Sequence, residues 1–287
     1  MTEGKGNDHS LIDIRDAGIV TQTWSESRHE DELLASMIGG KLSQLPPPTV
    51  VPTCIFRIPR LLRRNAEEES FVPGLVSIGP IHHGEDNLKA LEEVKLLYLQ
   101  GLLDRKPTPA TSLHNFVKET RSMEQDCRNS YDEKFPHFSS ENFVEMMVVD
   151  GCFVIELFRK FLGEVLKPKG DPVFSESWML TAISTDLLLL ENQLPWRVFN
   201  SLFHLTSDSE AGKLPLTELT LKYFKGCTLG WSDLHAINAA LPQHLLDFLC
   251  NCLHESSAES ETQNYGAMKM WRYSLEEILS ETLRLMT

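Results

Sequence analysis

The stretch SENFVEMMVVDGCFVIELFRKFLGE, residues 140–164, constrains the fold more than any other part of the chain. Its apolar residues recur every three or four positions, which is the spacing of one face of an α-helix. The positions on this stripe are Phe143, Met147, Val154, Leu157, Phe158 and Phe161. The positions on the opposite side are Glu141, Glu145, Cys152, Glu156 and Arg159. The pattern predicts a long helix with one buried stripe.

Other stretches with helical spacing predict a mainly α fold. The predicted helices span residues 86–105, 111–130, 176–192, 195–203, 214–224, 242–253 and 268–284. The segment 176–192 is apolar nearly all round and is therefore placed in the core. Pro195 interrupts it, because the residue before a proline avoids the helical conformation, and the next helix restarts there. No period of 20 to 50 residues appears, so a solenoid has no support.

Extended segments and a polar amino terminus complete the predicted organisation. Residues 1–48 are expected to form an extension with one short helix, which Gly39 and Gly40 end. Residues 49–287 are expected to form a single irregular helical domain, with short extended segments near residues 50–81. Within them, GLVSIG (residues 74–79) is either a short strand or an extended buried segment, and a helix is predicted to start after Pro59.

Composition and charge exclude several classes of protein. The 287 residues are 41% hydrophobic and 24% charged, as in ordinary soluble globular proteins. The 27 Lys and Arg residues against 41 Asp and Glu give a net charge of −14, which repels nucleic acids and anionic lipid surfaces. We find no secretory signal, no span of uncharged apolar residues long enough for a membrane, and six scattered cysteines without a disulfide framework. A cytoplasmic protein is predicted, and its oligomeric state stays open.

Two acidic residues lie among apolar ones and are candidate catalytic groups. Asp150 falls in the middle of the stripe of residues 140–164, and Asp186 falls in STDLLLLEN. A buried carboxylate must accept hydrogen bonds or take a raised pKa, so the pair suits an acid/base site or a metal site in a helical cavity. The alternative is structural: each carboxylate accepts bonds from an Arg, a His or a helix amino terminus and fixes the packing.

The adjacent histidines of SIGPIHHGE, His82 and His83, are the next candidates. Imidazole groups serve as proton carriers or metal ligands, but a metal needs three or four ligands, and no other His or Cys cluster has a recognised spacing. No metal and no cofactor are therefore expected. The structural prediction is that at least one of the two imidazoles bonds to a backbone or carboxylate group and fixes a turn.

Two polar groups of residues also have alternative interpretations. Arg57, Arg60, Arg63 and Arg64 are candidates for binding an anion, since the Arg fork suits phosphate, but the glutamates of NAEEES follow at once and favour self-pairing or a solvated face. Glu191, Asn192 and Gln193 are expected to satisfy backbone groups at the break before Pro195, and lining a pocket is their alternative role.

Five longer words identify a family. CIFRIPRLLRR, VPGLVSIGPIHHG, LEEVKLLYL, FVEMMVVDGCFVIELFRKF and DLLLLENQLPW occur in this order between residues 50 and 253. Together they closely resemble DUF247 (also UPF0481), a plant family of unknown function. The resemblance implies a plant-specific helical protein, and some members are linked genetically to self-incompatibility recognition in grasses. Typical members end in an apolar membrane anchor, which EEILSETLRLMT (residues 276–287) does not resemble, so a shortened carboxyl terminus is expected and peripheral membrane association is possible.

Two functions follow as hypotheses. No nucleotide-binding, serine-hydrolase, zinc-protease or calcium-binding motif is present, so the first hypothesis is an interaction protein for recognition or signalling, with an unidentified protein partner. The alternative is an enzyme of lyase or isomerase type that uses Asp150, Asp186, His82 or His83 in a helical pocket.

Overall fold

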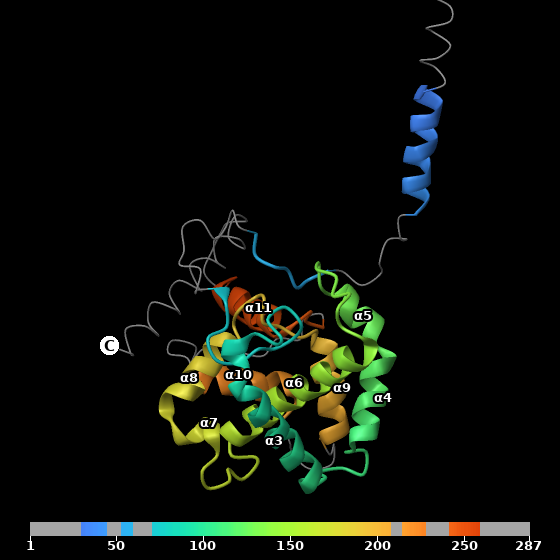
Figure 1. Cartoon of the computed structure of the whole chain (residues 1–287). Coiled ribbons are helices and arrows are strands. Elements are labelled where there is room, and N and C mark those ends of the chain that lie inside the picture. The colour runs from blue at the N-terminus through green and yellow to red at the C-terminus, as the bar shows by residue number, and fades with distance from the viewer. Residues whose placement is uncertain (1–29, 45–52, 60–70, 208–213, 228–240, 259–287) are drawn as a thin grey trace, which may run out of the picture. The chain divides into compact units, whose positions relative to one another are not determined.

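The computed structural model describes residues 30–44, 53–59, 71–207, 214–227 and 241–258. The chain divides into two compact units, residues 1–50 and 51–287. In the first unit, residues 30–43 form a helix, drawn in blue in Figure 1. The prediction that Gly39 and Gly40 end this helix is wrong. The helix continues past them because a glycine inside a helix costs only about 1 kcal/mol relative to alanine.

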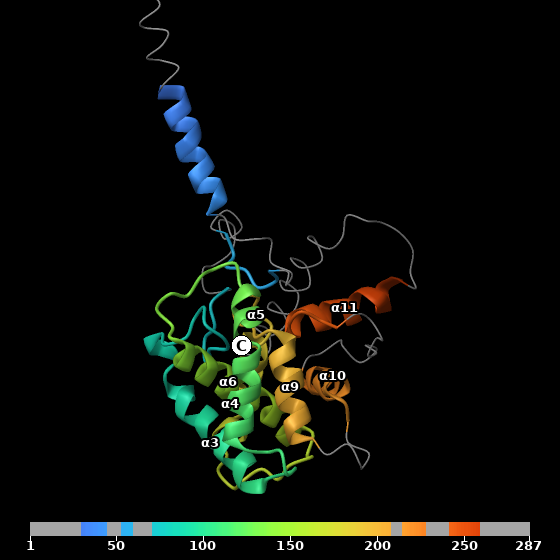
Figure 2. The ribbon, with the colours of Figure 1, turned by 90° about the vertical axis from the view of Figure 1, so that its right-hand side faces the viewer.

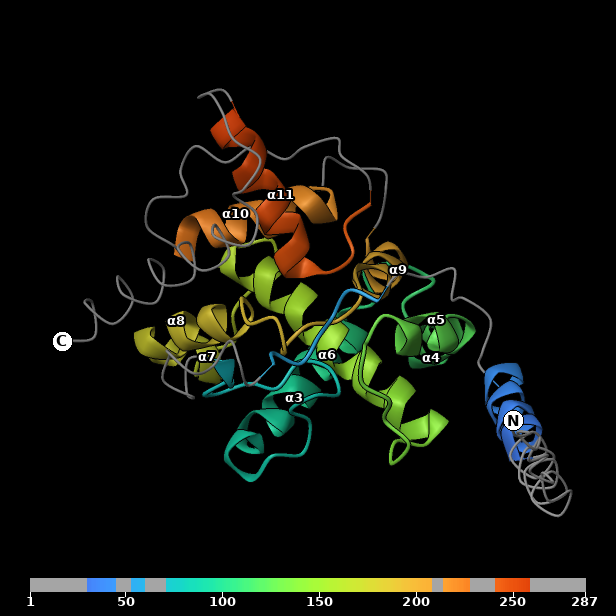
Figure 3. The same cartoon turned by 90° about the horizontal axis from the view of Figure 1, so that it is seen from above.

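The second unit is built around α6 (Ser140–Phe161), the helix predicted from the longest apolar stripe. It packs against α3, α4, α9 and α10, and Figure 3 shows it passing between them. The prediction of a solvent-facing side opposite the apolar stripe holds for Glu145, which is exposed. It is wrong for three residues, which are buried because neighbouring helices cover α6 on several sides: Cys152, Glu156 and Arg159. The predicted mainly helical fold is confirmed.

The helices before α6 follow the sequence pattern in part. A short 3₁₀ turn, η2 (Asp86–Leu88), leads into α3 (Ala90–Arg105), whose apolar stripe is buried as predicted. The predicted helix 111–130 is instead two helices, α4 (Leu113–Ser122) and α5 (Glu124–Asn129), which meet at Met123. The change of direction at Met123 positions the end of α5, where the Ser130 carbonyl accepts hydrogen bonds from the backbone amides of Cys54 and Ile55.

The helices after α6 differ from prediction at one break. A short helix, α7 (Pro172–Ser175), precedes α8 (Ser177–Asp186), which ends six residues before the predicted end of the segment 176–192. Its first half is not in the core, since the Trp178 side chain is 52% exposed. The predicted restart at Pro195 is confirmed, because α9 spans Trp196–Thr206.

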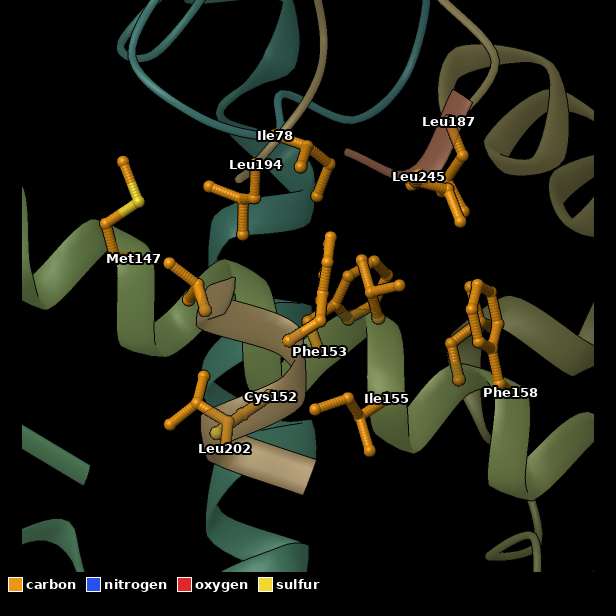
Figure 4. Close-up of a cluster of buried hydrophobic side chains, with 14 of the residues drawn as sticks. Ile78, Met147, Cys152, Phe153, Ile155, Phe158, Leu187, Leu194, Leu202 and Leu245 are labelled. Carbon is orange, nitrogen blue, oxygen red and sulfur yellow. The ribbon is translucent and has the colours of Figure 1, made fainter. Parts of the chain in front are cut away.

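The last described helices are α10 (Leu216–Cys227) and α11 (Leu245–Ala258), which Figure 2 shows beside α9. The predicted helices after Pro59 and at 268–284 lie outside the described residues. Figure 4 shows part of the core, with α6 side chains such as Phe153 and Phe158 and with Leu202 of α9 and Leu245 of α11. Gly151 allows α9 to approach α6 closely, since a Cβ there would lie 2.6 Å from Leu202 Cδ1.

Candidate functional site

The segment 71–85 contains VPGLVSIGPIHHGE and has no strand partner, so its backbone amides need other acceptors. Asp186, at the end of α8, supplies acceptors for three of them. Its Oδ1 accepts from Gly74 N at 2.9 Å, and its Oδ2 accepts from Leu75 N and Val76 N at 2.8 Å each. The GLVSIG stretch is therefore not a strand, and its backbone bends at Gly74 and Leu75.

Asp150 holds the same segment further along, from the middle of α6. Its Oδ2 accepts from Gly79 N at 2.9 Å, and its Oδ1 accepts from Lys95 Nζ at 2.7 Å. The Lys95 ammonium, which comes from α3, also donates to Glu92 Oε1 at 2.7 Å and to the Ser77 carbonyl. The side chains of Lys95 and Asp150 are 0% and 1% exposed. The prediction that Asp150 is buried and paired is confirmed.

Asn192 completes the set of acceptors for the segment 71–85. Its Oδ1 accepts from Ile78 N at 2.6 Å, while its Nδ2 donates to the carbonyls of Val76 and Asp186 at 3.0 Å each. One amide side chain thus makes both kinds of bond that a neighbouring strand would make.

Gln193 holds the break before Pro195 in a similar way. Its Nε2 donates to the carbonyls of Leu187 and Leu189 at 2.8 Å each, and its Oε1 accepts from Leu246 N at 3.0 Å. The prediction that residues 191–193 satisfy backbone groups at this break is confirmed for Gln193 and for the bond from Asn192 to the Asp186 carbonyl, whereas Glu191 accepts from Ile58 N in a distant segment.

Gly79 is required where the segment 71–85 crosses this break. Its φ is +80°, and a Cβ at this position would lie 2.5 Å from the Gln193 carbonyl oxygen. The Tyr131 hydroxyl donates to the same oxygen at 2.9 Å. Two causes therefore demand glycine, because other residues rarely adopt this φ and because the space is occupied.

His82 bonds to two carboxylates, which confirms the predicted structural contact. Its Nδ1 lies 2.8 Å from Glu85 Oε1, and its Nε2 lies 3.1 Å from Glu191 Oε2. A neutral imidazole has a single N–H, so both contacts are N–H donations only in the imidazolium form. Glu191 is fully buried, and its Oε1 also accepts from Ile58 N at 2.6 Å. His82 therefore joins the segment 71–85 to the segment before α9.

His83 plays no part in this set of contacts. Its ring packs against Phe138, with 5.5 Å between the ring centroids, and its buried Nδ1 has no hydrogen-bond partner within the described ranges. The two histidines of the HH pair thus have different environments.

Arg57 is the one member of the predicted arginine cluster that lies within the described residues. Its Nε donates to Glu133 Oε2 at 2.9 Å, and its Nη1 lies 3.8 Å from Glu191 Oε2. Pairing was predicted with the glutamates of NAEEES, but the described partners come from elsewhere in the chain. Arg60, Arg63 and Arg64 lie outside the described residues, so their anion binding stays a prediction.

Burial dominates the electrostatics of the two aspartates. It raises the pKa of Asp150, an effect that the Lys95 ammonium partly offsets, and it raises the pKa of Asp186 against three backbone N–H donors. Burial alone would lower the pKa of Lys95, but Asp150 and Glu92 outweigh it and leave that pKa raised. Lys95 therefore stays charged at neutral pH, and the pair is an ion pair.

The arrangement fits a structural role better than an acid/base role. Asp150 and Asp186 bind different points of the segment 71–85, and each of their four oxygens accepts a hydrogen bond from the chain. Among the residues that the structure describes, no group of three or more His, Cys, Asp and Glu is placed to hold a metal ion. The carboxylates act as acceptors that shape the backbone.

Lys95, the cation that contacts Asp150, was not predicted from the sequence. Lys95 lies four residues after Leu91 and three before Tyr98, on the stripe that α3 buries, so its position carried a signal. A second buried set was also missed: Asp171 accepts from Tyr98 OH at 2.8 Å and from Lys160 Nζ at 2.7 Å. Nothing in the apolar pattern distinguishes Lys160 from a surface lysine at a helix end.

These features define a class: a mainly helical protein in which buried carboxylate and amide side chains hold the segment 71–85, which belongs to no strand, against the core. The chain belongs to the DUF247 family, described as "Plant protein of unknown function", whose model matches residues 55–282. The family predicted from the five sequence words is confirmed.

Two curated proteins of Arabidopsis thaliana are similar to the chain. UPF0481 protein At3g47200 is 36% identical over 150 residues, which cover 52% of this chain and 31% of that protein. Putative UPF0481 protein At3g02645 is 27% identical over 219 residues, which cover 74% of this chain and 40% of that protein. The matches thus cover well under half of either relative's length. No solved structure matches the chain. Within the described ranges, no helix has the length and apolar character needed to cross a membrane.

Proposed function

We propose that this protein acts by binding a protein partner, in recognition or signalling in the plant cytoplasm, and not by turning over a substrate. The observation that carries the proposal is the engagement of Asp150 and Asp186, whose four carboxylate oxygens all accept hydrogen bonds from the chain itself. A general base must reach a substrate proton with a free oxygen, within about 3 Å. Here each oxygen already accepts a bond from the chain, and Asp150 and Asp186 are 1% and 5% exposed, which leaves a substrate little access to them.

The rival proposal, a lyase or isomerase, requires these carboxylates to face a cavity together with His82. His82 instead bonds to Glu85 and Glu191, and both of its ring nitrogens are engaged. Using it as a proton carrier would break a contact that holds the segment 71–85. The same contacts that favour a rigid scaffold therefore oppose catalysis at this place.

The helix of residues 30–43 supplies the second support, because the described part of its own unit leaves its apolar side chains uncovered. Each of these side chains is 48% to 63% exposed: Leu33, Leu34, Met37, Ile38 and Leu42. A helix of this kind typically docks into an apolar groove of another protein. Its first turn is acidic, with Glu30, Asp31 and Glu32, so the matching groove would have a basic rim. None of the six cysteines forms a disulfide, which favours a reducing compartment.

The test begins with proximity labelling by the full chain in plant cells, and each candidate partner is then purified. Direct binding is measured by calorimetry for the wild type, for Leu34→Glu on the apolar side and for Ser36→Glu as the matched control, since Ser36 is exposed and lies away from Leu34 on the helix. The expected result is a saturable 1:1 complex that Leu34→Glu weakens at least about tenfold, or about 1.4 kcal/mol, and Ser36→Glu leaves unchanged.

The enzyme alternative is tested in parallel. Purified protein is incubated with plant metabolite extract, and the extract is followed over time by mass spectrometry. Time-dependent loss of one metabolite that a folded Asp150→Asn or Asp186→Asn variant does not cause would contradict the proposal. Equal effects of Leu34→Glu and Ser36→Glu on partner binding would remove the role given to the helix 30–43.

A further inference from the structure

The carboxyl ends of α6 and α9 meet at an arginine whose hydrogen bonds are incomplete. Arg159 is only 5% exposed, and its guanidinium lies over the Phe203 ring at 5.1 Å. Its Nη2 donates to Ser207 Oγ at 2.6 Å and to the Thr206 carbonyl at 3.3 Å. Its Nη1 is buried and has no hydrogen-bond partner among the residues that the structure describes. One nitrogen of the guanidinium therefore contacts the Ser207 hydroxyl, while the other has no acceptor in the described part of the chain.

Glu156 does not supply the missing acceptor for Arg159 Nη1. Glu156, one turn earlier on α6, uses both carboxylate oxygens on Arg105, at 2.6 and 2.9 Å. A buried donor without an acceptor is unfavourable, and the planar fork of arginine matches the spacing of two oxygens of a phosphate. Burial lowers the pKa of Arg159, so an added negative charge beside it would be stabilising.

We propose that Ser207 is a phosphorylation site and that Arg159 is the preformed receptor for its phosphate. In the reaction, Ser207 Oγ attacks the γ-phosphorus of ATP, the bond to the ADP oxygen breaks, and the hydroxyl proton passes to the base of the kinase. The product places phosphate oxygens within reach of the free Nη1 and of Nη2. The inference uses other residues than the proposed function and stands independently of it.

Access and local charge agree with this assignment. Ser207 follows the last residue of α9, is partly exposed, and has extended backbone angles, φ −117° and ψ 122°. The sequence after it carries Asp208 and Glu210, so a kinase with a basic substrate groove is the matching class. Glu156, Glu164 and the carboxyl end of α9 oppose a phosphate here, whereas Arg159 and Arg105 favour it. The bidentate contact is what decides the balance.

The test uses the full chain, ATP and a purified acidophilic serine kinase. Mass spectrometry locates the phosphate, and a ³¹P NMR titration measures its second pKa, which is about 6 for a free phosphoserine. Pairing with Arg159 is expected to lower this pKa by about one unit, a tenfold preference for the dianion. Ser207→Ala is expected to remove the resonance, and Arg159→Gln to return its pKa to the ordinary value.

A reference in urea keeps the test valid if Arg159→Gln fails to fold. The phosphorylated wild type in urea gives the pKa of the same phosphate without the receptor, so the folded and unfolded values are compared within one protein. The proposal is overturned if the kinase modifies Ser209 and leaves Ser207 untouched. It is also overturned if the phosphate on Ser207 has the same pKa in the folded protein, in urea and in Arg159→Gln.

Discussion

Asp150→Ala is expected to destabilise the protein far more than Glu145→Ala, although the two residues lie on one helix. Asp150 is 1% exposed, bonds to Lys95 and accepts from Gly79 N, whereas Glu145 is exposed. Loss of one partner of a buried ion pair costs roughly 3 to 5 kcal/mol, because the other charge stays buried. Loss of an exposed carboxylate changes stability by about 0.5 kcal/mol or less.

The structure places the cost of the lost ion pair itself at the lower end of that range, at about 3 kcal/mol. Lys95 keeps a second carboxylate, Glu92, at 2.7 Å, so its charge does not become fully unpaired. The orphaned Gly79 N–H adds a penalty of about 1 to 3 kcal/mol. A total near 4 kcal/mol is therefore expected for Asp150→Ala, which is a large part of the stability of an ordinary domain.

Urea unfolding provides the assay, with midpoints compared at equal slopes. Matched controls come from Glu145→Ala and from the double variant Lys95→Met, Asp150→Leu, which removes both charges. The double variant is expected to recover much of the loss, because no buried charge remains without a partner. A midpoint for Asp150→Ala equal to that of Glu145→Ala would refute the reasoning. A stabilised Asp150→Ala that loses an activity would instead favour the enzyme hypothesis.

Three further predictions concern the same region. Gly79→Ala places a Cβ 2.5 Å from the Gln193 carbonyl oxygen at a φ of +80°, which should cost about 1 to 3 kcal/mol of stability. The melting temperature should therefore fall, and an unchanged melting temperature would contradict this prediction. His82→Ala removes one donor to the buried Glu191 carboxylate and should cost about 1 to 3 kcal/mol in urea unfolding. A chelator should leave the stability of the wild type unchanged. Zinc bound to the wild type and lost in the variant would overturn this prediction. Burial lowers the pKa of His244 to about 4, so on acidification the unfolded chain binds the extra proton at a higher pH than the folded chain. About 3 kcal/mol of stability is therefore lost as the pH falls from 6.5 to 4. The His244→Asn variant should lose less stability over that range, and an equal loss would argue against this cause.

The helices were predictable where one rule decided them. The apolar stripe of residues 140–164 predicted α6 nearly to its ends, and Pro195 predicted the start of α9. The burial of Asp150 followed from its place in the stripe. In each case the local sequence carries the cause, either a 3.6-residue period or the missing N–H of proline.

The rest depends on contacts between distant residues. The end of α8 at Asp186 is tied to three amides that lie more than a hundred residues earlier, so helix propensity alone could not place it. The partner of Asp150, Lys95, comes from another helix. The buried side of α6 at Glu156 appears only once Arg105 of α3 lies opposite. Tertiary contacts therefore override local preference at these sites.

Native-state hydrogen exchange tests most directly the central claim, that buried side chains hold the segment 71–85 as firmly as a strand would. It follows the amides of Gly74, Leu75, Val76, Ile78 and Gly79 in the unmodified protein. The account predicts that these amides exchange only through global unfolding, with the same free energy as the central residues of α6, although they belong to neither a helix nor a strand. Exchange of these amides at the rate of an exposed loop would contradict the account.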